Sequence, residues 1–254
     1  MALLKRLIVL ALAACASSLN VLNAAPCPYW TWDGFYVGVN AGIVRGYDKI
    51  SLTAKGLWGT TPQAVQNFLH VNGSTSLSNW NFIGGGQVGY NYQHKCWLLG
   101  LEADGNYVNL SAHRNTPQIV EPVLVQRFGF KDRIEHNWLA TVRPRIGYTI
   151  CQFLPYITGG FAAGDARVRS NIYGVTTNYS SEARRSKILY GWTVGAGLEY
   201  PIRPFLSLKA EYLYVNLGHF NTTSVPGPGF EGFFEERRIC VREDILRLGL
   251  NYRL

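Results

Sequence analysis

An alternation of apolar and polar residues runs to the last residue of the chain. Residues 244–254 read DILRLGLNYRL, with Leu or Tyr at every second position from Leu246 and Arg, Gly or Asn between them. A period of two is typical of a strand with one apolar and one polar face. Because terminal residues of most domains fray, a pattern kept to the end predicts a strand that pairs on both sides.

Eight segments share this alternation, and each has about the length of a tilted membrane-spanning strand. They are 32–45, 80–93, 96–109, 134–150, 155–169, 187–202, 205–217 and 239–254. Tight turns (HK, CQFL and RP) alternate with long polar or Gly/Pro-rich connections at 46–79, 110–133, 170–186 and 218–238. This alternation is typical of outer-membrane barrels and gives a soluble sandwich no advantage. The pattern predicts an all-β fold: an eight-stranded antiparallel up-and-down transmembrane β-barrel with short periplasmic turns and long extracellular loops.

Composition supports strands over helical bundles. Only 16% of the 254 residues are charged, whereas aromatic residues reach 13% and there are 27 glycines. Aromatic residues favour strands, and glycines favour turns and tight packing. In a soluble sandwich the apolar sides of the strands would pack inward, and this is the structural alternative.

The N-terminus has the anatomy of a secretory signal peptide. Lys5 and Arg6 precede an apolar run at 7–16, which is too short for a transmembrane helix. The prediction is a signal peptide at 1–24, a short periplasmic segment at 25–31 and an outer-membrane barrel domain at 32–254. LAAC at 12–15 also fits a lipoprotein cleavage box, which would place a lipid on Cys15.

Six stretches resemble the small outer-membrane β-barrel proteins of Gram-negative bacteria, the porin-like family of opacity surface antigens and the OmpA transmembrane domain. They are WDGFYVGVNAG (32–42), FIGGGQVGYNYQ (82–93), WLLGLEAD (97–104), WLATVRPRIGY (138–148), FLPYITGGFAAG (153–164) and GWTVGAGLEY (191–200). The resemblance implies an eight-stranded barrel in the cell envelope, exposed at the surface as an antigen.

The last residues of the chain resemble a signal for barrel assembly. Arg247, Gly249, Tyr252 and Leu254 resemble the C-terminal signal that the barrel-assembly machinery recognises, although such chains commonly end on Phe.

Pro144 lies within a predicted strand where the family pattern often has Gly. Since proline cannot donate to a strand ladder, we expect a bulge or a missing hydrogen bond there.

Charged residues fall on the inward side of four predicted strands at similar heights. They are Glu102, Asp104, Arg143, Arg145, Lys209, Glu211 and Arg247. The interior of eight strands is only wide enough for side chains, so these residues predict a layer of ion pairs that closes the lumen. The alternative is a narrow conduction path lined by the same groups.

A second set of cations lies at the predicted extracellular ends of strands. It comprises Arg45, Lys131, Arg133, Arg184, Arg185, Lys187, Arg237 and Arg238. A ring of cations at that height could hold the phosphates of lipopolysaccharide, and a solvated rim is the alternative.

Other motifs predict no cofactor and no catalytic site. GGGQVG at 84–89 is followed by YNYQHKCWLLG rather than by a helical pattern, so it does not indicate a dinucleotide site. The sequence has no predicted helix with clustered basic residues that would indicate binding to nucleic acid. His70, His113 and His219 lie in predicted extracellular loops, so a receptor for haem or another ligand is the second alternative to a structural or interaction protein.

Four cysteines follow the predicted signal peptide. The periplasm permits disulfides. Cys27, Cys96 and Cys151 map to the periplasmic end of the predicted barrel and Cys240 maps near the other end. The first turn lies beside the first strand, so we expect a bridge between Cys27 and Cys96.

Overall fold

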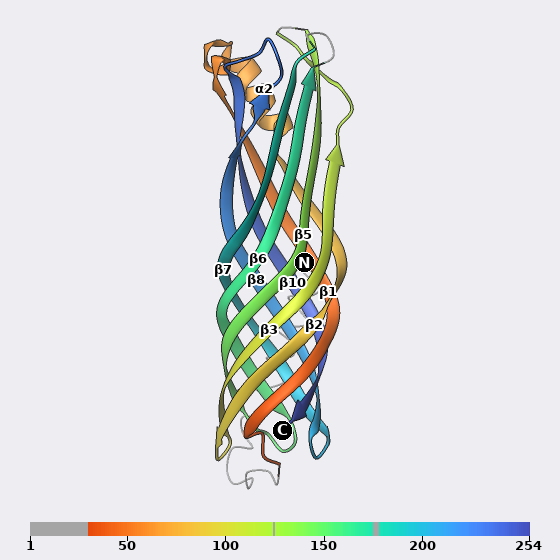
Figure 1. Cartoon of the computed structure of the whole chain (residues 1–254), viewed down its shortest axis with the longest axis vertical. Coiled ribbons are helices and arrows are strands. Elements are labelled where there is room, and N and C mark those ends of the chain that lie inside the picture. The colour runs from red at the N-terminus through yellow and green to blue at the C-terminus, as the bar shows by residue number, and fades with distance from the viewer. Residues whose placement is uncertain (1–29, 124, 175–177) are drawn as a thin grey trace, which may run out of the picture.

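The computed structural model describes residues 30–123, 125–174 and 178–254, which form a tall closed β-barrel (Figure 1). Eight long antiparallel strands make its wall. They are β1 (Gly34–Gly56), β2 (Thr75–His94), β3 (Trp97–Asn115), β5 (Gln126–Tyr148), β6 (Leu154–Gly174), β7 (Ser180–Arg203), β8 (Leu206–Thr223) and β10 (Phe233–Arg253). The predicted fold class is confirmed.

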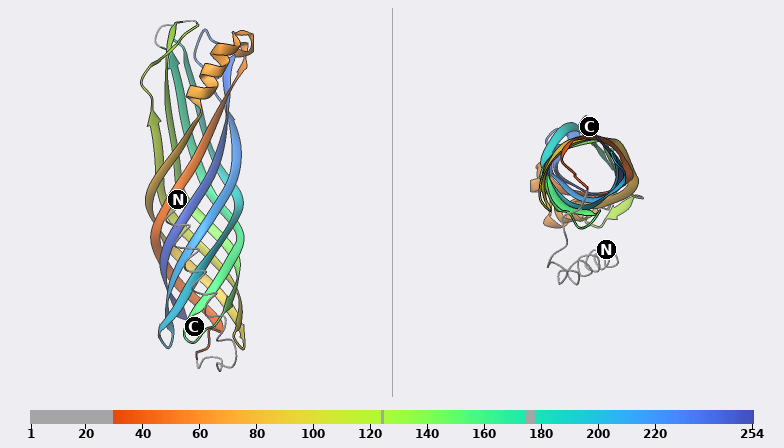
Figure 2. Two further views of the ribbon diagram at one scale, coloured as in Figure 1. Left: turned by 180° about the vertical axis from the view of Figure 1, so that it is seen from behind. Right: turned by 90° about the horizontal axis from the view of Figure 1, so that it is seen from below.

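The barrel closes because its first and last strands pair. The register of β1 with β10 runs from Tyr36 opposite Arg253 to Gly56 opposite Phe233, and β10 pairs with β8 on its other side. Pairing of β3 with β5 completes the ring, which Figure 2 shows from below. Even Leu254 donates its backbone N–H to the carbonyl of Phe35, at 2.9 Å. The last strand therefore has partners on both edges, as the terminal alternation predicts.

Tight turns lie at the lower end of Figure 1 and longer connections at the upper end. The upper end carries the 3-10 helix η2 (Leu57–Thr60), helix α2 (Gln63–Gly73) and two short strands, β4 (Ile119–Glu121) and β9 (Val225–Pro226). No helix among the described residues has the length and apolar character needed to cross a membrane. In outer-membrane barrels the long connections face the outside of the cell, so the α2 end is extracellular.

Outward-facing apolar side chains form a belt around the lower part of the barrel. Its upper edge passes through Ile43, Trp80, Tyr107, Trp138, Phe161, Ile188, Tyr214 and Leu246. Such a band, with aromatic residues at its edges, is the lipid-facing surface of a membrane barrel. The part of the described chain beyond this edge, toward α2, is here called the extracellular extension.

The strands continue far into this extension, so the predicted strands were too short. The first was predicted to end at Arg45 but continues to Gly56, and the last was predicted to begin at Ile239 but begins at Phe233. The predicted loops 46–79, 110–133, 170–186 and 218–238 begin and end with regular strand. In the extension the apolar side turns inward: Ile50 and Leu52 are buried, whereas Lys49 faces outward. This reversal of the facing made the strand ends look like polar loops in the sequence.

Side chains fill the lumen in layers. Trp32, Leu98 and Leu154 form a small apolar cluster at the periplasmic end. Above it lies a charged layer, and above that a large apolar cluster, here called the apolar plug. The plug comprises Val44, Ile50, Leu77, Ile83, Val108, Leu110, Ala112, Ile134, Leu139, Ala162, Ala166, Val168, Leu189, Leu213, Val215, Leu217, Phe220, Ile239, Val241 and Ile245. A barrel of eight strands has an interior that side chains of this size fill.

β5 passes through Pro144 without a bulge. Its pairing with β6 keeps one register from Leu139 to Gly147 but skips Arg143 and Pro144. The hydroxyl of Thr158 donates to the Pro144 carbonyl at 2.9 Å. The proline therefore interrupts backbone pairing, and the register shift lies higher, between Glu135 and Leu139.

Candidate functional site

The structure brings the seven predicted interior residues into one layer. Alternation on β3, β5, β8 and β10 turns all of them inward, and none is more than 6% exposed. Some of these residues lie far apart in sequence. Lys209 and Glu102 are separated by 107 residues, yet the Nζ of Lys209 lies 2.9 Å from the Oε1 of Glu102. Barrel closure is what places them together.

Arg143 lies at the centre of this layer. Its guanidinium is 2.7 Å from Glu102, 2.8 Å from Asp104 and 3.2 Å from Glu211. Arg247 lies 2.6 Å from Glu211 and 3.2 Å from Asp104 on the other side. Each of these three carboxylates thus contacts more than one cation, an arrangement that offsets the cost of removing charges from water.

Glu199 on β7 belongs to the same layer, although it was not among the predicted residues. Its Oε2 is 3.1 Å from Arg145, and it accepts hydrogen bonds from Ser207 and Asn251. With Glu199 the layer holds four cations and four carboxylates and is formally neutral. The alternation of β7 could have revealed it, because Glu199 shares the inward side with Gly195 and Gly197.

Two tyrosines support the layer from opposite sides of the barrel. Tyr36 donates to Glu102 at 2.7 Å and Tyr156 donates to Glu211 at 2.9 Å. Their rings lie 4.7 and 5.2 Å from the guanidinium of Arg145. Each tyrosine lies opposite a glycine of the next strand, Gly89 for Tyr36 and Gly197 for Tyr156. A Cβ at either glycine would meet the tyrosine hydroxyl at 2.3 Å, so the glycines make room for these contacts.

Gly89→Ala should therefore destabilise the barrel. The added methyl displaces the Tyr36 hydroxyl from Glu102, and we expect a loss of about 1–3 kcal/mol in the free energy of unfolding, typical of overpacking. Urea titration of the refolded protein measures it. Gly105→Ala is the matched control, because a Cβ there has nothing within 4 Å. Equal midpoints for the two variants would contradict this role of Gly89.

The apolar plug separates the charged layer from the extracellular side. Its side chains come from all eight long strands, and most are fully buried. Within it, the polar pair His136 and Asp48 makes a contact of 3.3 Å, and the other ring nitrogen of His136 lies 2.9 Å from the Asp165 carbonyl oxygen. The plug was not predicted, although most of its residues lie on the inward side of the predicted strands; only Ile50, Leu77, Leu110, Ala112 and Phe220 fall in the predicted loops.

A buried carboxylate closes the extracellular mouth. Glu235 accepts hydrogen bonds from Trp58 of η2 at 3.1 Å, from Ser181 at 2.7 Å and from Ser224 at 2.5 Å, and a further one from Tyr179. Trp58, Tyr179 and Ser224 lie in three different connections, and Ser181 lies at the start of β7. Burial, reinforced by the Glu235 charge, raises the pKa of the Tyr179 hydroxyl well above its usual range. We call Glu235 and these four donors the Glu235 clamp.

Arg237 was wrongly assigned to the outer rim. It is 1% exposed and faces the interior beside the clamp, because alternation on β10 turns Glu235, Arg237 and Ile239 inward. Burial lowers the pKa of its guanidinium from the ordinary value, and nearby Glu235 and Asp132 oppose that effect. Its neighbour Arg238 faces outward.

Six of the remaining rim cations are exposed on the extension: Lys131, Arg133, Arg184, Arg185, Lys187 and Arg238. Arg45 is half-buried, with its guanidinium 4.5 Å from the ring centre of Tyr47 and 5.1 Å from that of Trp80. The structure adds Arg167 and Arg169, which are exposed on β6 between these residues. Their position on the same side of β6 as Phe161 was the signal that could have found them.

The predicted loop histidines lie on separate elements. His70 is on α2, His113 on β3 and His219 on β8, where it lies 3.2 Å from Arg238. No group of three or more His, Cys, Asp or Glu side chains in the described part of the chain is placed to hold a metal ion.

The disulfide prediction rests partly on residues outside the description. Cys96 is disulfide-bonded, whereas Cys151 and Cys240 are free thiols. Cys15, Cys27 and the predicted signal peptide at 1–24 lie outside the described residues. The Cys27–Cys96 pairing stays a prediction, as does lipidation of Cys15.

The proposed assembly signal occupies the periplasmic half of β10. Arg247 faces inward in the charged layer, and Gly249 lies beside the aliphatic chain of Lys209. Tyr252 and Leu254 are exposed on the outside, at 51% and 74%. Recognition of these residues by the assembly machinery stays a prediction.

A family model and several known proteins are similar to this chain. Residues 8–253 match a family model described as outer membrane protein beta-barrel domain. A 31 kDa outer-membrane immunogenic protein of Brucella melitensis biotype 1 is 32% identical over 235 residues, which cover 91% of this chain and 87% of that protein. A 22 kDa outer membrane protein of Rhizobium leguminosarum bv. viciae is 31% identical over 134 residues, 52% of each chain. The crystal structure of OprG from Pseudomonas aeruginosa aligns with a TM-score of 0.43 and 10% identity, covering 89% of this chain and 100% of OprG.

Proposed function

The chain belongs to the family of outer membrane protein beta-barrel domains, and on that premise we propose that it is a closed, surface-exposed barrel that acts through its extracellular extension. Its role is that of a structural or interaction protein of the outer membrane, not that of an enzyme. The observation that carries this proposal is the apolar plug, which fills the lumen above the charged layer.

Two stacked layers of opposite chemistry make a poor path for solutes. An ion that crossed the charged layer would meet a region lined mainly by Val, Ile and Leu, where the polar pair His136 and Asp48 is already engaged and little else could replace the hydration of the ion. The charged layer itself is formally neutral and internally paired, so it offers little selectivity for either sign of ion. A narrow porin is the alternative that this arrangement disfavours.

The extension supports an interaction role. Long strands carry its outer face well beyond the membrane belt, and the Glu235 clamp holds its mouth in a defined shape. Relatives named outer-membrane immunogenic proteins fit such exposure, because an antigen must be reached from outside the cell. The haem alternative gains no support from the three histidines, which lie on separate elements.

Solute flux into liposomes tests the closed lumen. The refolded mature protein is reconstituted beside protein-free liposomes and liposomes that contain a general porin, and swelling is followed in a small sugar. We expect the swelling rate to equal that of protein-free liposomes. A rate that rises with the amount of folded barrel would support the porin alternative.

A further inference from the structure

Three arginines form a row across the outer face of the extension. Arg133 on β5 lies directly opposite Arg169 on β6, which lies directly opposite Arg184 on β7. Like charges at directly opposed positions destabilise a sheet. An anion bound across the row would remove that repulsion.

The surroundings of the row are strongly cationic. Arg133 lies 2.6 Å from Glu135, and Arg184 contacts Glu182, but Arg169 in the middle forms no ion pair with a carboxylate of the described residues. Lys131 and Arg167 flank the row on the same side of their strands. The face thus carries five cations against the three carboxylates Glu135, Asp165 and Glu182. We call it the arginine face.

Two further cations lie on β7 beside this face. β7 pairs with β8 from Trp192 to Arg203 and with β9 at Ser181 and Glu182, and no pairing with either strand is present between these stretches. Alternation places Arg185 and Lys187 on the opposite side of β7 from Arg184, yet both are exposed, because this edge of the strand has no partner. They therefore add positive charge near the row without belonging to the arginine face.

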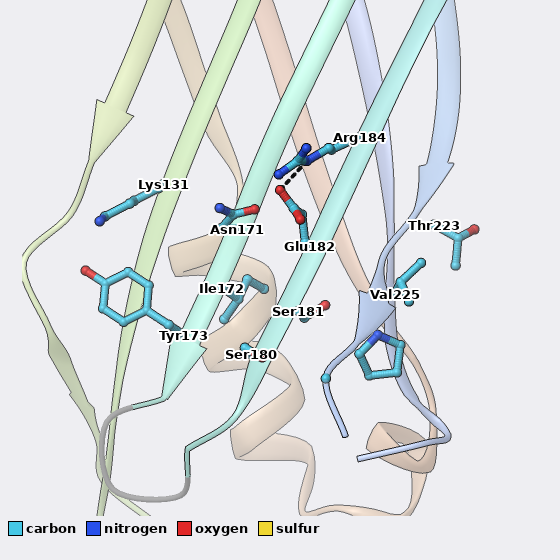
Figure 3. Close-up of a pocket in the computed structure, with 12 residues that line it drawn as sticks. Lys131, Asn171, Ile172, Tyr173, Ser180, Ser181, Glu182, Arg184, Thr223 and Val225 are labelled. Carbon is cyan, nitrogen blue, oxygen red and sulfur yellow. Dashed lines mark hydrogen bonds and ion pairs between the residues drawn. The ribbon is translucent and has the colours of Figure 1, made fainter. Parts of the chain in front are cut away.

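A pocket opens at the end of the arginine face that is nearer to α2, which is the lower end in Figure 3. Its volume is about 590 Å³, within the range of small-ligand sites, and Lys131, Asn171, Tyr173, Ser180 and Arg184 help to line it. The lining is rich in hydroxyl, amide and charged groups. The buried Oδ1 of Asn171 has no hydrogen-bond partner among the described residues, so it can accept a bond from a ligand hydroxyl.

The position of the face favours a ligand from the same membrane. The strands that carry it present Trp138 and Phe161 to lipid lower down, so the face looks sideways over the membrane surface rather than away from the cell. Arg167 lies six residues beyond Phe161 along β6. At ~3.3 Å per residue and a tilt of roughly 40°, this is about 15 Å higher. Phosphorylated core sugars of lipopolysaccharide stand directly above the lipid headgroups.

We propose that the arginine face binds the phosphorylated core oligosaccharide of lipopolysaccharide. Phosphate groups lie across Arg133, Arg169 and Arg184, whose planar guanidinium groups suit bidentate contacts to phosphate oxygens. A neighbouring sugar occupies the pocket, with a hydroxyl donating to Asn171. This proposal goes beyond the closed-barrel function and does not depend on whether the lumen conducts.

The test uses the full refolded barrel and purified core oligosaccharide freed of lipid A. A triple variant carries Arg133→Gln, Arg169→Gln and Arg184→Gln. Its matched control carries Lys49→Gln, Arg238→Gln and Arg242→Gln, which remove the same charge from exposed positions on β1 and β10. Affinity is measured by calorimetry, after the gel-mobility shift on heating confirms that each barrel is folded.

We expect the triple variant to bind at least about tenfold more weakly than the wild type and the control to bind normally. Phosphatase treatment of the oligosaccharide should cause a similar loss. Asn171→Ala should weaken oligosaccharide binding severalfold without changing weak competition by inorganic phosphate.

Three results would overturn the proposal. Equal affinities of the triple variant and its control would show that the row is not the site. Equal binding of phosphorylated and dephosphorylated oligosaccharide would remove the role of phosphate. Binding of a sulfated polysaccharide but not of the core oligosaccharide would place the ligand outside this membrane.

Discussion

Replacing Arg143 with methionine should lower the free energy of unfolding of the barrel by about 3–5 kcal/mol. Arg143 contacts Glu102, Asp104 and Glu211 at 3.2 Å or less, and all four side chains are buried. Without it, the four carboxylates of the layer share the three remaining cations, and the layer becomes net negative. Urea titration of the refolded protein, followed by gel mobility without heating, measures the loss.

Two further variants separate this effect from a generic one. Arg242→Met removes an exposed arginine from β10 and should change stability by no more than about 0.5 kcal/mol. The double variant Arg143→Met with Glu102→Gln restores neutrality, so its loss should be smaller than the sum of the two single losses. Additive losses, or an Arg143→Met midpoint like that of Arg242→Met, would show that the layer does not act as a coupled network.

Glu235→Ala should open the extracellular mouth while the membrane-embedded barrel stays folded. The change leaves the buried donors of Trp58, Tyr179, Ser181 and Ser224 without their acceptor. Each such group costs about 1–3 kcal/mol, so local opening should become easier by at least about 3 kcal/mol, a factor above 100 in population. Limited trypsin digestion measures it through faster cleavage after Lys55, which immediately precedes Gly56 and η2.

Glu236→Gln provides the control for this experiment. Glu236 is the next residue of β10 and faces outward, where it contacts Asn221 at 3.4 Å. Its cleavage rate should match that of the wild type. If Glu235→Ala were cleaved no faster than Glu236→Gln, the clamp would not be what holds the connections together.

The eight strands could be predicted from the sequence because the membrane requires apolar side chains on the outward side of every strand. Below Ile43 the apolar residues of β1 face lipid, and a period of two is then easy to recognise. Above Ile43 the facing reverses: Val44, Ile50 and Leu52 turn inward and pack against other strands. The period continues but its phase changes, and this change hid both the strand extensions and the apolar plug.

Candidate residues were placed correctly where the prediction considered which side of its strand each residue occupies. Inward alternation and neighbouring strands sufficed to group Glu102 with Arg143 and Glu211 with Arg247. The rim was assigned by position along the strand alone, so Arg237 was included although it faces inward. Contacts across the lumen, such as Lys209 with Glu102, depend on closure of the ring and not on any local pattern.

Planar-bilayer conductance of the refolded mature protein tests the central claim, because small ions would detect even a narrow path. Correct folding is first established by the shift in gel mobility on heating. The stacked charged layer and apolar plug predict a silent bilayer at both polarities, for the wild type and for any Arg143→Met protein that remains folded. Discrete, reproducible openings of the wild type would contradict the closed lumen and would make the charged layer the lining of a pore.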